Sequence, residues 1–445
     1  MDTTISRAWS ASVPRDILLA TPEPEIKRQE AIHELIYTEE DYVRDLNLLD
    51  ELFAKALTTA PCIPVERREE FTRTVFFNYL DVQEANTKLY RDLNDRQNLC
   101  QARSEAGFVD QIGDIFFRHA EELCKPYLTY GPNVVLTEYI VRREILSNVL
   151  FANFLRDKEK KAELRKLPFR HFLILPVTRL QRYPLLIRAV LKTTPVDHPD
   201  FEALTKTLDI ITRAASQVDV ATVESKAKAR MLQIADSVRD NTPQSVSRLK
   251  LDHPSRRLFM EGHLTRRSQT GVETIDLHVF LFDHMLLMTK VRKDTMNEDE
   301  YCISKRYIPL RLLKVQEVNE LSTIKSRSAS HNGTSYANML PALQVPSTFV
   351  IAHLGRRGGI YIVTADSVAD KVIWKEKIAE AKRAWAASHA DKEPFDIRIL
   401  SDITFPGSTH GSISLNFGKV LCSTPFSKSY LRYCEICTEF YANRA

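Results

Sequence analysis

A single glutamate lies on what is otherwise the apolar face of a predicted helix near the N-terminus. Glu39 falls between Ile36 and Val43 in the three-to-four spacing that places side chains on one helix face. Buried there without a partner, a carboxylate would cost several kcal/mol. Glu39 therefore either has a partner inside the protein or faces a groove that another molecule fills. Taken alone, the spacing favours an internal or solvated glutamate. The apolar face comprises Ile32, Ile36, Val43, Leu46, Phe53 and Leu57.

A second segment of interest is the run FLILPVTRLQRYPLLIRAVLK, residues 172–192. Pro176 and Pro184 predict a kinked or broken helix, because a proline in a helix interior costs about 3 kcal/mol. Thr178 and Arg182 are four residues apart and share a helix face. Two further arginines, Arg179 and Arg188, add positive charge nearby. The alternative is an amphipathic helix whose arginines are simply solvated.

A third predicted helix carries an acid beside its apolar face. Asp219 lies next to residues that repeat by threes and fours. Considered alone, such an acid is more often a surface charge than part of a site. The apolar face of this helix consists of Phe201, Leu204, Leu208, Ile211, Ala215, Val218 and Thr222.

The motifs of several enzyme classes are absent from the sequence. It contains no GxxxxGK loop, no HExxH and no GxSxG. Its seven cysteines are dispersed, which predicts reduced thiols in a cytosolic protein. Cys434 and Cys437 form one CxxC, but no second ligand pair lies at zinc spacing, so we expect no metal and no cofactor.

Charge and hydropathy exclude further classes of protein. A net charge of +4 is too small to predict a concentrated basic face, so we expect no nucleic-acid partner. We find no signal peptide and no apolar run of about 18 residues, the length of a membrane span. With 44% hydrophobic residues the chain can bury a core. We therefore expect a folded cytoplasmic protein.

The composition and the spacing of apolar residues change along the chain and predict its domains. We expect a disordered tail over residues 1–24, an all-α helical bundle over 25–240 and a linker over 241–255. Short β-rich runs and one closing helix over 367–388 predict a small barrel or sandwich in 256–390. Ser322–Gln344 is expected to be a long loop inside it.

Two of these motifs resemble the Dbl homology domain of Rho exchange factors. IHELIYTEEDYVRDLNLL, residues 32–49, is similar to that family's first conserved region, and residues 172–200 are similar to its third. The resemblance implies an elongated helical exchange domain that binds a Rho-family GTPase in its nucleotide-free or GDP form. It also implies roles for four residues. Glu39 would contact switch I, and Arg182 and Asp219 would face switch II. Thr178 stands where the family often has glutamine.

The unit that follows resembles a pleckstrin homology domain, beginning at Leu258. Trp374 is similar to the tryptophan that closes the barrel of that fold. A basic rim is expected to attract acidic membrane lipids weakly, and its residues are Arg266, Arg267, Lys290, Arg292 and Lys293. The variant LPVTRLQRYPLL is most similar to fungal exchange factors for Rho1-type GTPases, in which a citron homology domain follows. Residues 391–445 resemble a truncated start of that domain.

Together these resemblances imply a guanine-nucleotide exchange factor that promotes GDP release without covalent chemistry. It would be cytoplasmic and recruited peripherally to the plasma membrane. Two alternatives remain open at this point. One is a scaffold that binds a GTPase without catalysing exchange, and the other is a membrane adaptor whose function resides in the pleckstrin homology unit.

Overall fold

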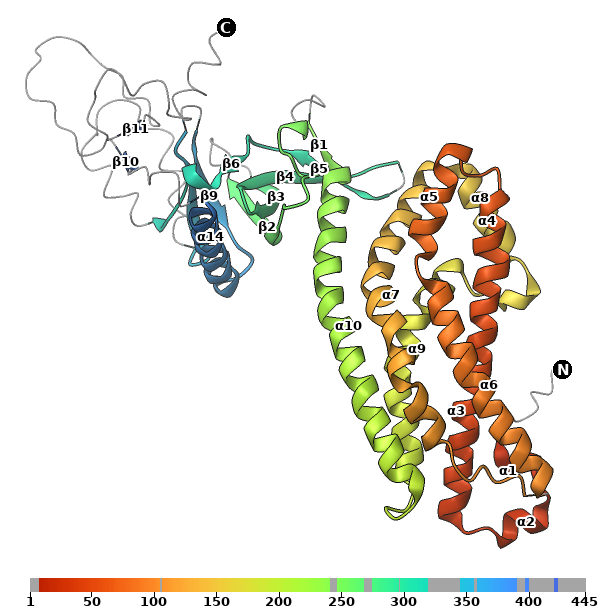
Figure 1. Cartoon of the computed structure of the whole chain (residues 1–445). Coiled ribbons are helices and arrows are strands. Elements are labelled where there is room, and N and C mark those ends of the chain that lie inside the picture. The colour runs from red at the N-terminus through yellow and green to blue at the C-terminus, as the bar shows by residue number, and fades with distance from the viewer. Residues whose placement is uncertain are drawn as a thin grey trace, which may run out of the picture. The chain divides into compact units, whose positions relative to one another are not determined.

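The chain folds into two compact units, residues 1–233 and 234–445 (Figure 1). This computed structural model describes residues 8–104, 106–240, 246–267, 274–295, 297–318, 345–355, 358–389, 397–399 and 420–422. The loop expected at Ser322–Gln344 and the pair Cys434 and Cys437 lie outside the described residues. Each unit is described by itself below.

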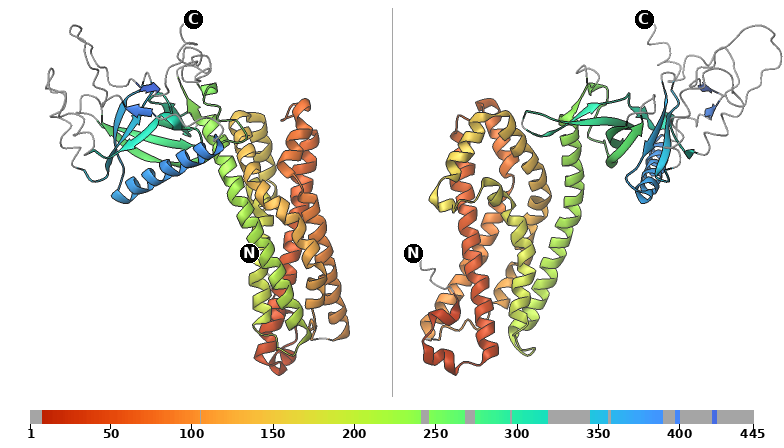
Figure 2. Two further views of the ribbon diagram at one scale, coloured as in Figure 1. Left: turned by 60° about the vertical axis from the view of Figure 1, so that its left-hand side comes forward. Right: turned by 180° about the vertical axis from the view of Figure 1, so that it is seen from behind.

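The first unit is a bundle of long α-helices, as predicted. Its five longest helices are α3, α6, α7, α9 and α10, which lie side by side (Figures 1 and 2). The helical elements are α1 (Trp9–Ser12), α2 (Arg15–Ala20), α3 (Glu23–Leu48), a π-helix (Leu49–Ala54), α4 (Lys55–Thr59), α5 (Val65–Phe76), α6 (Tyr79–Arg103), α7 (Gly113–Ser147), α8 (Val149–Glu159), a 3-10 helix (Ala162–Leu164), α9 (Phe169–Leu191) and α10 (Pro199–Ser237).

The apolar faces predicted from spacing form the core of this bundle. On α3, Ile32 and Leu46 have no exposed surface, and α3 packs against both α6 and α9. Gly131 of α7 allows α10 to approach closely, because a Cβ at this position would lie 2.3 Å from Cγ1 of Val218. Helix α9 continues through Pro176 and Pro184, so of the predicted kink or break, the break does not occur.

The N-terminal residues correct one prediction. Residues 1–24 were expected to be disordered, but the described part contains α1 and α2. Trp9 is completely buried, and its ring stacks on Phe108 with 5.3 Å between ring centroids. A segment rich in Ser, Thr and Pro with one tryptophan does not predict this anchor, because a single large side chain contributes no periodicity. The segment is a docked part of the helical unit.

The second unit is a sheet, antiparallel except for the pairing of β1 with β5, that is closed by a helix, as predicted. Its main sheet has the strand order β1-β5-β4-β3-β2-β9-β8-β7, with β6 paired to β4. Trp374 of α14 is buried against the sheet, beside Gly262. The elements are β1 (Val238–Arg239), β2 (Leu258–Arg267), β3 (Thr274–Phe282), β4 (Met285–Lys293), β5 (Asp299–Ile303), β6 (Ile308–Pro309), a 3-10 helix (Leu310–Leu312), β7 (Leu313–Gln316), β8 (Thr348–His353), β9 (Ile360–Thr364) and α14 (Val368–Ser388).

The boundary between the units lies slightly earlier than expected. Residues up to 240 were assigned to the helical domain, but β1 pairs in parallel with β5 and therefore belongs to the sheet. Farther along the chain, β10 (Ile397–Ile399) pairs antiparallel with β11 (Val420–Cys422). Most of residues 391–445 lie outside the described part, so the start of a citron homology domain stays an expectation.

Candidate functional site

Glu39 is an internal residue of the helical bundle. Its side chain has no exposed surface and forms an ion pair with Arg179 of α9, with Nη2 2.6 Å from Oε2. The same guanidinium donates through Nε to Oε2 at 3.0 Å, and the Tyr183 hydroxyl lies 2.7 Å from that oxygen. Arg179 also donates to the Thr38 hydroxyl at 3.1 Å. A buried carboxylate of this kind is stabilised by multiple charge-assisted hydrogen bonds.

The polar network continues into α6 and α7. The Tyr183 hydroxyl lies 2.7 Å from Oδ1 of Asn86, whose Nδ2 donates to the Tyr127 hydroxyl at 2.9 Å. Burial raises the pKa of Tyr183 well above its usual range, and the neighbouring Glu39 charge adds to this effect. The Tyr183 hydroxyl therefore keeps its proton and remains a donor. Burial acts to lower the pKa of Arg179, but the electrostatic interactions with Glu39 and Tyr183 and their hydrogen bonds to the guanidinium together outweigh it and raise that pKa.

These contacts correct the expected role of Glu39. A side chain without exposed surface, already bonded to Arg179 and Tyr183, does not offer its carboxylate to a partner protein. Arg179 likewise is not a solvated surface charge, since only 4% of its side chain is exposed. The sequence did contain a signal for this pair, because Arg179 and Tyr183 are four residues apart and so share the face of α9 toward α3.

Three of the four residues expected to bind a GTPase do lie on the surface. Thr178 and Arg182 are exposed on α9, and Asp219 is exposed on α10. The Thr178 hydroxyl donates to the backbone oxygens of Ile174 and Leu175, within its own helix. Gln181 connects the two helices, since its Nε2 lies 3.4 Å from Oδ1 of Asp219. The structure thus brings the polar residues of α9 and α10 to one surface.

The acid that completes this surface is Glu34. Its carboxylate lies 3.5 Å from the Arg182 guanidinium, with 43% of the Glu34 side chain and 54% of the Arg182 side chain exposed. A long, exposed ion pair contributes little to stability. The ion pair can therefore open at a small cost in free energy, and each group can then bind a partner protein.

Apolar side chains accompany these charges. Leu185 on α9 and Val220 and Val223 on α10 are 64%, 71% and 67% exposed. Large exposed apolar residues next to polar ones are typical of protein-protein contact surfaces. Sequence spacing alone missed them, because they fall outside the buried faces that the period identifies. We call Glu34, Thr178, Gln181, Arg182, Leu185, Asp219, Val220 and Val223 the α3-α9-α10 surface.

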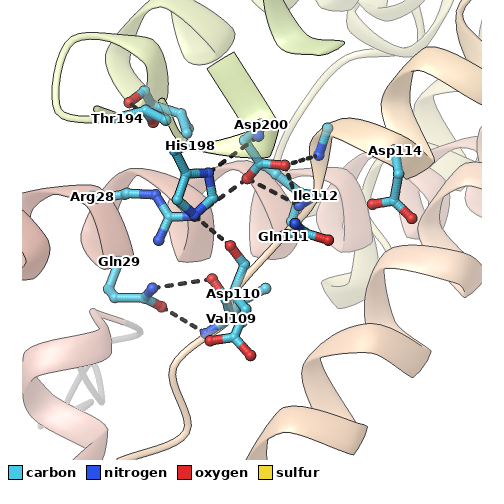
Figure 3. A network of polar contacts seen from close by, with 12 residues as sticks. Arg28, Gln29, Val109, Asp110, Gln111, Ile112, Asp114, Thr194, His198 and Asp200 are labelled. Carbon is cyan, nitrogen blue, oxygen red and sulfur yellow. Dashed lines mark hydrogen bonds and ion pairs between the residues drawn. The ribbon is translucent and has the colours of Figure 1, made fainter. Parts of the chain in front are cut away.

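A buried ion pair fixes the helices that carry this surface (Figure 3). Arg28 of α3 lies 3.2 Å from Asp200 of α10, and both side chains are almost fully buried. Asp200 also accepts hydrogen bonds from the backbone N–H groups of Ile112 and Gly113, at the N-terminus of α7. Side-chain acceptors at this position satisfy helix N–H groups that have no partner within the helix. Arg28 and Asp200 therefore tie α3, α7 and α10 together at one end of the bundle.

The second unit contains a basic pocket of about 560 Å³. Lys290 and Arg292 of β4 line it, together with Arg239 and Lys305, which were not expected there. Arg266 lines it too, but is buried rather than exposed on a rim, and its guanidinium lies over Tyr361. Lys293 pairs with Asp299 on the neighbouring strand, and the Arg267 side chain lies outside the described residues. The cations thus form a pocket rather than the expected rim.

Within the described ranges, we find no helix with both the length and the apolar character to cross a membrane. Both units match known families. Residues 31–219 match the RhoGEF domain, and residues 258–382 match a pleckstrin homology domain. The chain therefore belongs to the proteins that carry a RhoGEF domain followed by a pleckstrin homology domain.

The curated relatives of this chain include fungal Rho1 exchange factors. The chain is 34% identical over 385 residues to Rho1 guanine nucleotide exchange factor 1 of Schizosaccharomyces pombe, a match covering 84% of this chain and 28% of that protein. It is 33% identical over 317 residues to Rho1 guanine nucleotide exchange factor 2 of the same organism, covering 71% of this chain and 27% of that protein. The chain thus spans less than a third of the length of these relatives.

Solved structures show the same fold. The DH/PH domains of PDZ-RhoGEF in complex with GTP-gamma-S activated RhoA match with a TM-score of 0.55 and 20% identity, over 84% of this chain and 99% of that chain. The DH/PH domains of p115-RhoGEF match with a TM-score of 0.58 and 19% identity, over 85% of this chain and 99% of that chain.

Proposed function

We propose that this protein is a guanine-nucleotide exchange factor that promotes GDP release from a Rho-family GTPase, with a Rho1-type GTPase favoured. The observation that carries the proposal is the α3-α9-α10 surface, which presents Glu34, Arg182 and Asp219 within a RhoGEF domain. Both curated relatives named above are Rho1 guanine nucleotide exchange factors by name, and this supports the choice of GTPase. No bond of the nucleotide is made or broken in such a reaction.

The mechanism is differential binding. A factor that prefers the nucleotide-free GTPase to the GDP-bound form lowers the barrier to GDP release. Glu34 would hold one switch segment of the GTPase, and Arg182 and Asp219 the other. Each charge-assisted hydrogen bond contributes about 1.5–3 kcal/mol. Two or three of them, formed only in the open state, accelerate release by roughly a hundredfold or more, since each 1.4 kcal/mol is about tenfold in rate.

Release of fluorescent GDP from a purified Rho1-type GTPase tests the proposal. The wild-type chain is expected to accelerate release, and Arg182→Glu to reduce the acceleration at least tenfold with an unchanged melting temperature. Lys88→Glu on α6 is the matched control, because Lys88 is 53% exposed and also forms an ion pair, with Glu84. A chain that captures the nucleotide-free GTPase without accelerating release would instead be a non-catalytic GTPase-binding scaffold.

The basic pocket supports a second proposal, weak recruitment of the protein from the cytoplasm to acidic lipids of the plasma membrane. Lys290, Arg292 and Lys305 gather positive charge on the pleckstrin homology unit, whereas Arg239 is paired with Glu300 in the same pocket. Each basic residue near an acidic membrane surface contributes about 1 kcal/mol, and salt screens the attraction. If such binding alone carried the function, the chain would be a membrane adaptor and would not accelerate GDP release.

A further inference from the structure

A groove of about 1040 Å³ lies on the helical unit beside the α3-α9-α10 surface. One wall is the N-terminal half of α3, from Glu23 to Tyr37. The opposite wall is the turn after α9, and Ala8 contributes a third side. Glu34 lines this groove and also pairs with Arg182 on the surface described above. The groove and the surface are therefore continuous.

The N-terminal side of the groove is held by a buried anchor. The Trp9 indole donates to the backbone oxygen of Ala106 at 3.0 Å. The backbone N–H groups of Trp9 and Ser10 donate to the two carboxylate oxygens of Glu30, at 3.0 and 2.9 Å. Ala8, the residue before Trp9, is thus held against α3 by the hydrogen bonds of Trp9 and Ser10. This wall is built before any partner binds.

The other walls are equally well supported. Arg28, on the buried side of α3, is bonded to Asp200 and to the backbone oxygen of Asp110 (Figure 3). In the turn after α9, the Thr193 and Thr194 hydroxyls donate to the backbone oxygen of Val190. A groove whose walls are fixed in the free protein loses little conformational entropy on binding, which favours a specific partner.

The charges at the rim of the groove indicate a polar protein surface as its occupant. Lys27 pairs with Glu23, and Glu30 is engaged by backbone N–H groups. Lys192 lines the groove and forms no ion pair within the described part of the chain. Lys192 and Glu34 therefore offer one cation and one acid to an occupant, next to small and apolar side chains such as Ala31 and Ala189.

We infer that this groove is an extension of the GTPase-binding surface, occupied by a part of the bound GTPase that adjoins the contacts of Glu34 and Arg182. The inference rests on the proposed exchange function. Its basis is continuity, because Glu34 belongs to both the groove and the surface, and a GTPase seated on one reaches the other. The N-terminal segment, which lies before the matched RhoGEF domain, thereby forms part of the recognition site.

Blocking the groove away from Glu34 tests the inference. Thr193→Trp fills the groove at its far end, and Lys192→Glu reverses the charge at its rim. We expect each variant of the full chain to bind the nucleotide-free Rho1-type GTPase at least tenfold more weakly, with an unchanged melting temperature. Thr87→Trp on α6 is the control, because Thr87 is exposed and its hydroxyl, like that of Thr193, donates to a backbone oxygen earlier in the chain.

The outcomes separate the groove from the proposed function. Unchanged binding by Thr193→Trp and Lys192→Glu, with Glu34→Ala impaired, would overturn the inference and leave the exchange function intact. Faster exchange by Thr193→Trp would also overturn it, since the groove would then hold a segment of the chain itself. Absence of exchange by the wild type would refute the proposed function. If Thr193→Trp does not fold, amide hydrogen exchange of the wild type decides: binding of the GTPase must slow hydrogen exchange at residues 192–194.

Discussion

Replacing Glu39 by alanine should destabilise the helical unit rather than remove a partner contact. The substitution leaves the Arg179 guanidinium, 4% exposed, without its carboxylate, and leaves the Tyr183 hydroxyl with Asn86 as its remaining acceptor. Removing one partner of a buried ion pair costs about 3–5 kcal/mol. This is a large part of the roughly 5–15 kcal/mol by which a domain is stable. For a unit of this size, about 2–4 °C is lost per kcal/mol, so the melting temperature should fall by roughly 6–20 °C.

Glu34→Ala is the matched comparison on the same helix. Its ion pair with Arg182 is long and exposed, so its loss should change stability by about 0.5 kcal/mol or less. Far-UV circular dichroism at 222 nm follows the helical unit, and fluorescent GDP release follows exchange. Glu39→Ala should melt early yet support exchange at low temperature, whereas Glu34→Ala should melt normally and exchange slowly. The reverse pattern, a normally melting Glu39→Ala without exchange, would refute the assignment of Glu39 as an internal anchor.

Three further predictions follow from the structure. Gly131→Ala should destabilise the bundle by about 1–3 kcal/mol in thermal unfolding, although alanine is the better helix former, because its Cβ would meet Val218 at 2.3 Å. Burial lowers the pKa of His33, so its stabilising contribution is complete above the unfolded pKa of about 6.5 and is lost as the pH falls below it. His33→Gln should therefore lose less melting temperature than the wild type between pH 7.5 and 5.5, and an equal loss would contradict this. Lys290→Glu combined with Arg292→Glu should abolish low-salt binding to phosphatidylserine vesicles, and selective phosphoinositide binding that persists at high salt would contradict a weak electrostatic mode.

Periodicity was sufficient to predict the two architectures. The three-to-four spacing on α3 identified side chains that are buried, including Ile32 and Leu46. The β-rich runs located β3, β4, β8 and β9, and the closing helix α14 was expected at almost its observed bounds. These predictions succeeded because burial of one face is a property of the local sequence. The position of Trp374 followed from the resemblance, which implies the packing of a whole fold.

Long-range contacts were harder to predict. Docking of the N-terminal segment depends on Trp9 finding Phe108 and Ala106, about a hundred residues away in the sequence. The basic pocket likewise includes Arg239, which β1 brings beside β5 by a parallel pairing across the predicted linker. Neither contact produces a local repeat of apolar residues in the sequence. Composition alone therefore assigns such segments to tails and linkers.

A single physical reason explains why Glu34, and not Glu39, is available to a partner protein. Helix spacing states which residues share a face, and Glu39 was correctly placed on the face that points inward. An acid on that face is either paired inside the protein or faces a groove that another molecule fills. Which of the two occurs depends on whether a cation from another helix reaches the acid. Arg179 does so, 140 residues along the chain, and Tyr183 completes the pairing. A residue paired in this way holds α3 against α9 and sets the register of the two helices. That register in turn places Glu34 beside Arg182 at the surface, so the buried acid acts on partner binding only through the exposed one.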